Sequence, residues 1–232
     1  MRAVRSVAAA LLPALLFLGG CEPRQVDPNQ LPRIAIMCAF DAELQALLAQ
    51  MQETSSATVI GRTFHIGKLG GKDVVLFASG ISEVNAAMMA QAVVSGYNVT
   101  ALVFSGVAGG LDPALNVSDV IVPEWWAQYQ EQVYARAIPG GWDPWGPGYP
   151  INYPNYGMIF PLELCATSVS GPPDAEECRF WFRTDPALYH VAERSLNAIR
   201  LKRCKKNGEC LENEPKVVIG GYAVTSPTFM DN

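Results

Sequence analysis

Apolar and polar residues follow two different periods along the chain from residue 33 onward. Continuous apolar runs are typical of strands that are covered on both faces of a sheet. Strands are expected at 33–40, 101–106, 119–123 and 216–226, with a hairpin over 58–80 that turns at Gly70-Gly71. Apolar residues at helical spacing predict helices at 41–51, 82–97 and 185–201, the first with Asp41 as its N-cap. Strands that alternate with helices predict an α/β layered domain, in which ligands bind beyond the carboxyl ends of the strands.

Residues 1–32 do not follow this pattern. Two arginines precede a short apolar run that ends in Leu-Gly-Gly-Cys at 18–21. This arrangement predicts a lipoprotein signal peptide over 1–21, with Cys21 as the lipidated first residue; an ordinary signal peptide with a chance cysteine is the alternative. The polar, proline-rich segment 22–32 is expected to be a tether. The sequence therefore predicts an exported protein, held by a lipid anchor at the periplasmic or outer face of a membrane.

Composition excludes some classes of partner and cofactor. Half of the 232 residues are apolar, which is ample for a hydrophobic core. The formal net charge is −5 and no basic stripe occurs, so no nucleic-acid partner is expected. The chain has no GxGxxG turn, no phosphate-binding loop with lysine and no GxSxG elbow, and no cofactor is expected.

Because the protein is expected to be exported to an oxidising compartment, its cysteines are expected to form disulfides. Cys165 and Cys178 bracket a Gly-Pro-Pro-Asp turn, and Cys204 and Cys210 bracket a short polar loop. Proximity favours these two local disulfides, although four cysteines permit three pairings. A zinc site is the rival interpretation, but the spacings are not CxxC, so no metal is expected. Cys38 lies within an apolar strand and is expected to be a core residue.

Unusual residues collect where the predicted strands end. A carboxylate (Glu43) follows the first strand, the turn Ser79-Gly80 follows the hairpin, and Phe229 follows the last strand. The stretch 105–110 is almost bare of side chains, and glycine there costs backbone entropy. Either the turn is tight, or another object packs against its bare backbone. Hydroxyls, a carboxylate, bare backbone and a flat ring could together hold a sugar with an attached aromatic base.

Several motifs, in the right order, carry a family resemblance. They are IAIMCAFDAEL, GKLGGKDVVLFASGISEVNAAMMAQ, VFSGVAGGLDPALNVSDVIV, FRTDPALYHVAERSL and YAVTSPTFMDN. Together they resemble the nucleoside phosphorylase superfamily, most closely its 5′-methylthioadenosine/S-adenosylhomocysteine nucleosidase branch. The resemblance covers most of 33–123 and 181–232, and it implies a three-layer αβα sandwich around a mixed central sheet, and a homodimer. An aromatic-rich insertion at about 125–180 has no counterpart; its part 134–163 is interpreted either as a lid over the cleft or as a surface loop packed on its own aromatic rings.

The resemblance implies a role for each candidate residue. Glu43 corresponds to the carboxylate that positions and deprotonates the attacking water; on its own it would be read as a glutamate that stabilises a helix N-terminus. Ser79 corresponds to a residue beside the ribose or anion, the alternative being a cap of the helix 82–97. Phe229 corresponds to a ring that stacks on the purine, the alternative being a core residue. The other implied substrate contacts are Gly80, Ser105, Gly106, Ala108, Gly109 and Met230.

The nature of the nucleophile follows from what the motifs lack. Phosphorylases of the family carry arginines around phosphate, and no arginine occupies the corresponding places after residues 38 and 103. Water is therefore the expected nucleophile, and the sequence predicts a nucleosidase-like N-ribosyl hydrolase for a purine nucleoside or a related compound. A nucleoside phosphorylase and a non-catalytic nucleoside-binding lipoprotein are the alternatives.

The family pattern also includes two motifs that this sequence does not contain. One is a Met-Glu pair that holds the ribose hydroxyls, and the other is a Ser-Asp pair whose aspartate protonates the leaving base. On this basis the domain 33–232 is expected to be incomplete, to lack its last elements and, as a 232-residue chain, to show no measurable turnover.

Overall fold

The computed structural model describes residues 28–130, 133–134, 136–142, 158–159, 163–167, 172, 174–196 and 198–229. The expected signal peptide with Cys21, much of the aromatic insertion and Met230 lie outside the described residues. The lid hypothesis for 134–163 therefore stays a prediction. Within the described part of the chain, no helix is both long enough and apolar enough to cross a bilayer.

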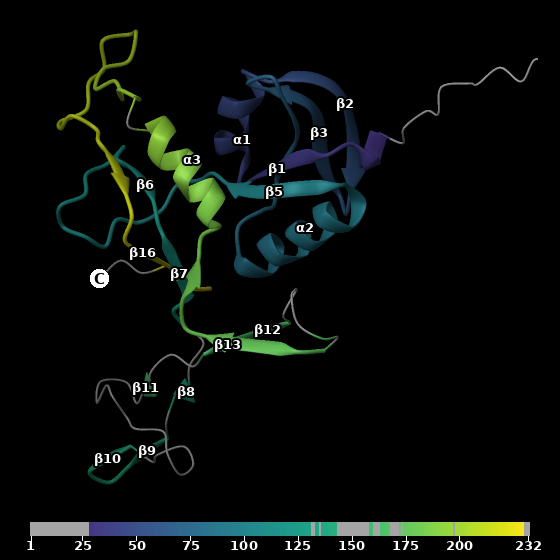
Figure 1. Cartoon of the computed structure of the whole chain (residues 1–232). Coiled ribbons are helices and arrows are strands. Elements are labelled where there is room, and N and C mark those ends of the chain that lie inside the picture. The colour runs from purple at the N-terminus through teal and green to yellow at the C-terminus, as the bar shows by residue number, and fades with distance from the viewer. Residues whose placement is uncertain are drawn as a thin grey trace, which may run out of the picture.

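A mixed five-stranded sheet forms the first half of the fold (Figure 1). Its strands, in spatial order, are β2 (Gln52–Val59), β3 (Arg62–Leu69), β4 (Lys72–Ala78), β1 (Arg33–Cys38) and β5 (Val99–Phe104). β1 runs parallel to both of its neighbours, β4 and β5, whereas β2, β3 and β4 are antiparallel. A short 3₁₀ turn, η1 (Pro28–Gln30), leads into β1.

The two helices that follow β1 and β4 cover opposite faces of this sheet. Alternate residues of a strand point to opposite faces, and the core is divided accordingly. Met37, Phe64 and Phe77 pack with Met89 of α2 (Glu83–Gly96), whereas Cys38, Leu76 and Ala78 pack with Leu44 of α1 (Asp41–Leu48). Full burial of each large apolar side chain contributes roughly 1.5–3 kcal/mol. The predicted three-layer αβα arrangement around a mixed sheet is confirmed.

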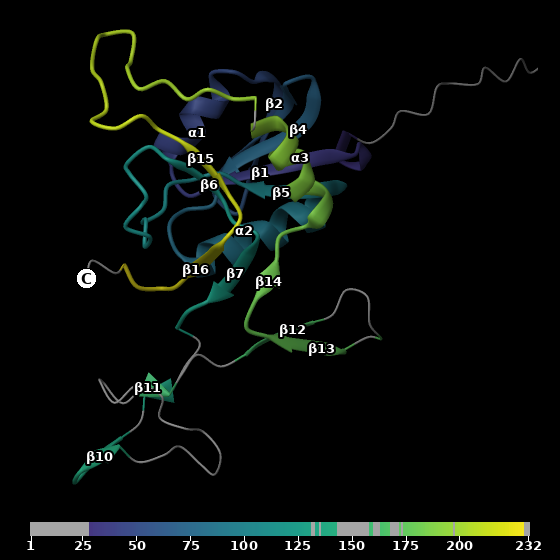
Figure 2. The ribbon, with the colours of Figure 1, turned by 60° about the vertical axis from the view of Figure 1, so that its left-hand side comes forward.

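The second half of the chain adds short strands and one helix (Figure 2). β6 (Val120–Val122) pairs in parallel with β15 (Val217–Ile219), and β7 (Trp125–Gln128) pairs in parallel with β16 (Tyr222–Thr225) and antiparallel with β14 (Phe182–Arg183). Helix α3 (Pro186–Leu196) lies between β14 and β15 in sequence. The remaining strands are β8 (Val133–Tyr134), β9 (Ala137–Ile138), β10 (Gly141–Trp142), β11 (Met158–Ile159), β12 (Leu164–Thr167) and β13 (Glu176–Arg179).

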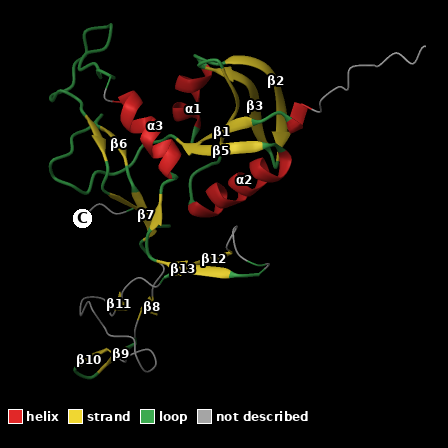
Figure 3. Ribbon diagram, in the orientation of Figure 1, coloured by secondary structure: helices red, strands yellow, loops and turns green. Residues whose placement is uncertain are grey.

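Four details differ from the sequence-based expectations (Figure 3). The helix expected over 185–201 is α3, which ends at Leu196. The single strand expected at 216–226 is two strands, because Gly220 and Gly221 adopt φ angles of +104° and +80° and send the two halves to different partners. β2 was not expected, because its sequence QETSSATV has no apolar face. Asp41 is the first residue of α1 and not its N-cap, which is Phe40.

Both expected disulfides are present. Cys165 and Cys178 face each other across the β12–β13 pair and are joined, and Cys204 is joined to Cys210 across a tight loop. Cys38 is fully buried and unpaired, as expected for a core residue. Burial raises the pKa of the Cys38 thiol to about 11, and the nearby Glu43 carboxylate adds to the shift, so the thiol is neutral at physiological pH.

Candidate functional site

The parallel pairing of β4, β1 and β5 brings three candidate segments to one edge of the sheet. Ser79 N donates to Cys38 O at 2.8 Å, and Ser105 N donates to Met37 O at 2.9 Å. The chain therefore leaves the three strands at the same level, with α1 after the middle one. The structure thus brings Glu43, the Ser79-Gly80 turn and the stretch 105–110, called the bare turn below, to one edge of the sheet. Their roles as site residues stay predictions.

Glu43 connects α1 to the bare turn. Its Oε2 atom accepts hydrogen bonds from the backbone N–H groups of Ala39 and Phe40, at 2.7 and 3.3 Å. Its Oε1 atom accepts from the N–H of Val107, at 2.7 Å. The carboxylate therefore does satisfy donors at a helix N-terminus, which was the alternative interpretation, and it also holds the turn after β5. A carboxylate oxygen has two lone pairs, so Oε1 retains a position for a further donor.

A side chain on Gly106 would meet this carboxylate. A Cβ atom on Gly106 would lie 2.9 Å from Glu43 Oε1 and 3.1 Å from a ring carbon of Phe104. Both distances are below ordinary van der Waals contact, so the carboxylate would have to shift. Gly109 differs, since a Cβ atom there would meet nothing within 4 Å. A side chain at Gly106 would therefore contact the protein itself, whereas the open side of Gly109 faces free space.

Ser79 is only 1% exposed, and its hydroxyl lies within hydrogen-bonding distance of two carbonyl oxygens. The Oγ atom lies 3.2 Å from Cys38 O and 2.8 Å from Gly80 O. It does not cap α2, since that role belongs to Ser82, whose Oγ accepts from Asn85 N at 3.3 Å. The alternative interpretation of Ser79 as a cap is therefore wrong, and its contact with ribose stays a prediction.

Arg62 is a residue that the sequence-based search for the site did not find. Gly80 has a φ of +90°, and a Cβ atom on it would lie 2.5 Å from Arg62 Nη2, so the guanidinium rests on the bare face of Gly80. The tight turn at Ile60 and Gly61, with φ angles of +49° and +73°, starts the strand that carries Arg62. An arginine at the start of a β-strand carries no sequence signal that marks it as a site residue. Only the pairing of β3 with β4 shows that Arg62 lies beside Gly80.

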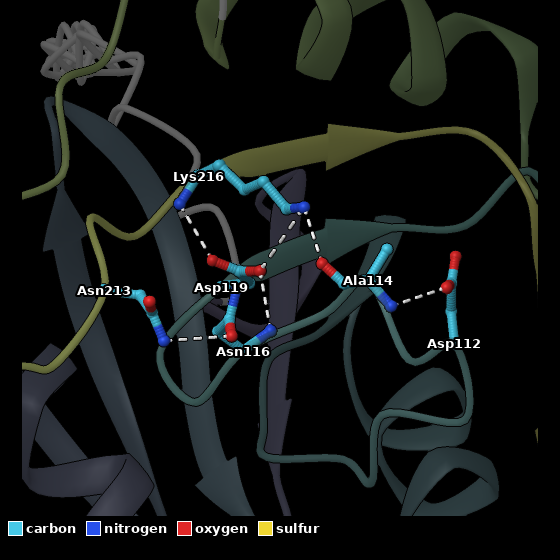
Figure 4. Close-up of polar contacts among 6 residues, drawn as sticks. All are labelled: Asp112, Ala114, Asn116, Asp119, Asn213 and Lys216. Carbon is cyan, nitrogen blue, oxygen red and sulfur yellow. Dashed lines mark hydrogen bonds and ion pairs between the residues drawn. The ribbon is translucent and has the colours of Figure 1, made fainter.

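The far end of the bare turn is fixed by a polar network around Asp119 (Figure 4). The Asp119 side chain is 2% exposed and accepts hydrogen bonds from the backbone N–H groups of Asn116 and Lys216, each at 2.9 Å. Lys216 Nζ donates to Ala114 O at 2.7 Å, and Asn213 Nδ2 donates to Asn116 Oδ1 at 3.0 Å. Residues 114–119 are thereby attached to the segment that leads into β15.

The Asp119 network predicts a measurable dependence on pH. The pKa of Asp119 is lowered from its ordinary value of 3.8, first by the hydrogen bond from the N–H of Asn116 and then by that from Lys216. Because the charged form is favoured in the folded chain, the stabilisation is complete above pH 3.8 and is lost as the pH falls through the lower folded pKa. Asp119→Asn should lower the melting temperature at neutral pH and weaken the further loss in acid. Thermal unfolding from neutral pH down to about pH 3 tests this.

Asp73→Asn is the matched control for this prediction. The Asp73 carboxylate is 43% exposed and pairs with Lys68 on the surface, where an ion pair contributes little. Its substitution should leave the curve of melting temperature against pH nearly unchanged. Identical curves for Asp119→Asn and the unsubstituted chain would contradict the prediction.

Phe229 is 89% exposed, so the alternative interpretation as a core residue is wrong. The backbone before it is held by Ser226, whose Oγ accepts from Thr228 N at 3.1 Å, and Thr228 Oγ1 donates to Gln130 Oε1 at 2.8 Å.

Gln128 Nε2 donates to Glu83 Oε2 at 2.6 Å, which links the end of β7 to the start of α2. Met230 lies outside the described residues. Among the described residues, no group of three or more His, Cys, Asp or Glu side chains could hold a metal ion.

Comparison with known proteins decides the family. The family model described as "Phosphorylase superfamily" matches residues 33–230. The chain belongs to the phosphorylase superfamily. Bark storage protein B of Populus deltoides is 29% identical over 189 residues, which cover 78% of this chain and 58% of that protein. The 5′-methylthioadenosine/S-adenosylhomocysteine nucleosidase of Marinomonas sp. (strain MWYL1) is 37% identical over 91 residues, which cover 39% of each chain.

Solved structures share the fold of this superfamily member. A futalosine hydrolase mutant of Helicobacter pylori strain 26695 superposes with a TM-score of 0.58 at 18% identity, covering 87% of this chain and 71% of that one. A nucleosidase from Neisseria meningitidis, in complex with methylthio-immucillin-A, gives a TM-score of 0.56 at 21% identity, covering 86% and 66%. The matched part spans 58% of the bark storage protein's length and 39% of the Marinomonas nucleosidase's length. The superfamily and fold predicted from the motifs are confirmed, and the nucleosidase branch is represented among the matches.

Proposed function

We propose that this member of the phosphorylase superfamily is a nucleosidase-like N-ribosyl hydrolase that acts on a purine nucleoside or a related compound. The observation that supports it most is the position of Glu43, whose carboxylate lies at the carboxyl edge of the sheet and against the bare turn after β5. The nucleosidase match and the nucleosidase and futalosine hydrolase structures favour hydrolysis over other reactions of the superfamily.

In this proposal Glu43 is the general base. Water held at the remaining lone pair of its Oε1 atom would lose a proton to the carboxylate as it attacks the anomeric carbon, and the C–N bond to the base would break through an oxocarbenium-like state. The electron pair of that bond would leave with the base, which would take up a proton from a second water molecule. The carboxylate would also stabilise the positive charge that develops on the ribose. The nucleoside would lie against the open side of Gly109, and Phe229, which is exposed, would stack on the purine.

The reaction with and without phosphate tests the proposal. A form of the protein that also carries the Met-Glu and Ser-Asp motifs is used, because the 232-residue chain by itself is expected to show no turnover. It is incubated with purine nucleosides, and free base, ribose and ribose 1-phosphate are measured. Release of free base and ribose without phosphate supports hydrolysis. Formation of ribose 1-phosphate, with no base release unless phosphate is present, would overturn the hydrolase assignment and would point to Arg62 as the first arginine to substitute.

A non-catalytic role is the second candidate, and one observation favours it. Two relatives that match over 78% of this chain are named for storage. They are the bark storage proteins A and B of Populus deltoides. Saturable binding of a purine nucleoside without release of base, in phosphate and in its absence, would identify a binding protein. The same experiment therefore separates the two candidates.

We further propose that Cys21 is acylated and anchors the mature protein at a membrane facing the periplasm or the cell exterior. The support is the Leu-Gly-Gly-Cys sequence at 18–21 after a short apolar run. Cys21→Ser should move the protein from the membrane fraction to the soluble fraction of the expressing cells. Cys38→Ser serves as the control for loss of a thiol. Equal membrane partition of the Cys21→Ser protein and the unsubstituted protein would refute the anchor.

A further inference from the structure

A chain of hydrogen bonds runs from the start of α2 to the segment that carries Phe229. Glu83, the first residue of α2, accepts at its Oε2 atom from Gln128 Nε2, at 2.6 Å. Gln128 Oε1 accepts from the backbone N–H of Gln130, at 3.1 Å, and Gln130 Oε1 accepts from Thr228 Oγ1, at 2.8 Å. Because Thr228 immediately precedes Phe229, the chain joins α2 to the ring that is proposed to stack on the purine.

The carboxylate of Glu83 depends on its contact with Gln128. Solvent does not reach the Oε1 atom of Glu83, and among the described residues that atom has no hydrogen-bond partner. The other oxygen accepts from Gln128 at the short distance of 2.6 Å, and hydrogen bonds to an ionised group are roughly twice as strong as neutral ones. A desolvated carboxylate that also lost this donor would be costly. The end of β7 is therefore held firmly against the start of α2.

The other links of the chain attach the segment that follows β16. β7 and β16 pair with Gln128 opposite Thr225, and the printed register of this pairing ends there. Beyond it, Ser226 Oγ accepts from Thr228 N, which fixes the local shape of the segment but not its direction. The hydrogen bond from Thr228 to Gln130 attaches this local turn to the residues after β7. The direction of the segment thus depends on where Gln128 and Gln130 are held.

We propose that Glu83, Gln128 and Gln130 are positioning residues, which hold Phe229 where its ring stacks on the purine. The inference rests on the proposed function, because it assigns Phe229 a contact with a nucleoside. The ring is 89% exposed in the free protein, so its place is set by the backbone before it and not by packing. A group that is already in place before binding loses less conformational entropy when the ligand arrives. None of the three positioning residues has to touch the ligand.

Hydrogen exchange tests the link without any ligand. In Gln128→Glu two carboxylates would meet at the 2.6 Å contact, and their repulsion should break the link to Glu83. When Glu83→Gln is combined with Gln128→Glu, the amide of residue 83 donates to the carboxylate of residue 128, which still accepts from the N–H of Gln130. The N–H groups of Gln130 and Thr228 should exchange at least threefold faster in Gln128→Glu and at the original rate in the combined protein. Equal rates in all three proteins would overturn the proposal.

Nucleoside affinity shows whether the link acts through Phe229. The ligand is formycin A, a purine nucleoside analogue whose base is joined by a carbon–carbon bond and is not hydrolysed. Calorimetric titration compares Gln130→Ala, Phe229→Leu and the protein with both changes, in the form that also carries the Met-Glu and Ser-Asp motifs. Gln130→Ala should weaken binding about threefold to tenfold, as loss of one hydrogen bond does. The protein with both changes should bind no more weakly than Phe229→Leu alone, because a positioning effect disappears with the ring it positions.

The control and the contrary outcomes separate this inference from the proposed function. Gln50→Ala removes an exposed glutamine after α1 and should leave affinity unchanged. Unchanged affinity in Gln130→Ala, or losses that add fully in the protein with both changes, would overturn the positioning role. Formycin A that does not bind the unsubstituted protein, or that binds Phe229→Leu equally well, would instead refute the proposed stacking on Phe229. The exchange rates would still decide whether Glu83 holds the segment.

Discussion

Replacing Glu43 by glutamine should abolish nucleoside hydrolysis and also destabilise the protein. The amide cannot accept the proton of the attacking water, and loss of a general base costs on the order of a hundredfold to ten-thousandfold in rate. The amide also carries an NH₂ group in place of one carboxylate oxygen. Whichever way it turns, that group faces a backbone donor, either the N–H of Val107 or those of Ala39 and Phe40.

A change that keeps the shape of the side chain would leave the fold intact only if the carboxylate served catalysis alone. The N–H of Val107 is exposed and those of Ala39 and Phe40 are partly buried, so the loss is expected to be near the net contribution of one hydrogen bond, about 0.5–1.5 kcal/mol. Each kcal/mol lowers the melting temperature of a domain of this size by roughly 2–4 °C.

Rates of base release and melting temperatures of the Glu43→Gln protein measure both effects. Glu212→Gln, which removes an exposed carboxylate far along the sequence, is the control and should change neither. Full turnover by Glu43→Gln would remove this residue from the mechanism. An unchanged melting temperature would show that the hydrogen bond to Val107 contributes nothing to stability.

Much of the sheet was predictable because its strands have a strong local signal. β1, β4 and β5 are apolar runs that end at turns, so their existence follows from the pattern, whereas their spatial order does not. β2 has mostly exposed polar residues and owes its place to pairing with β3, which no local pattern records. The division at Gly220-Gly221 depends on backbone angles, since either half of 216–226 reads equally well as part of one strand.

The position of the candidate residues at one edge of the sheet could be predicted from the sequence, but their contacts could not. Glu43 and the bare turn were found through motifs, yet the hydrogen bond between them joins residues 64 positions apart. Sequence reasoning explained the missing side chains by a bound nucleoside alone, whereas a side chain on Gly106 would also meet the Glu43 carboxylate. Arg62 was missed because its position depends on how β3 lies against the end of β4. Long-range contacts of this kind appear only when the strands are paired.

Gly106→Ala and Gly109→Ala should therefore have different effects, although they are neighbouring substitutions in the same turn. In Gly106→Ala the new methyl group would lie 2.9 Å from Glu43 Oε1, so the carboxylate has to move and its hydrogen bond to Val107 N weakens. Because the carboxylate ends a flexible side chain and the turn is exposed, the expected loss of stability is about 1 kcal/mol or less, the net contribution of one hydrogen bond. The base would also leave its position, so turnover should fall with stability. In Gly109→Ala nothing lies within 4 Å of the added methyl group, and the melting temperature should not change.

Ligand binding completes the comparison between the two glycine variants. If the nucleoside lies against the open side of Gly109, the methyl group added there meets the ligand, so affinity for a purine nucleoside should fall at least tenfold while the fold stays intact. Affinity and melting temperature are measured side by side on both proteins. A Gly109→Ala protein that binds nucleoside with unchanged affinity would remove the bare turn from the ligand site. A Gly106→Ala protein with unchanged stability would show that the Glu43 carboxylate is not held against this turn, and the assignment of Glu43 as a positioned base would fail with it.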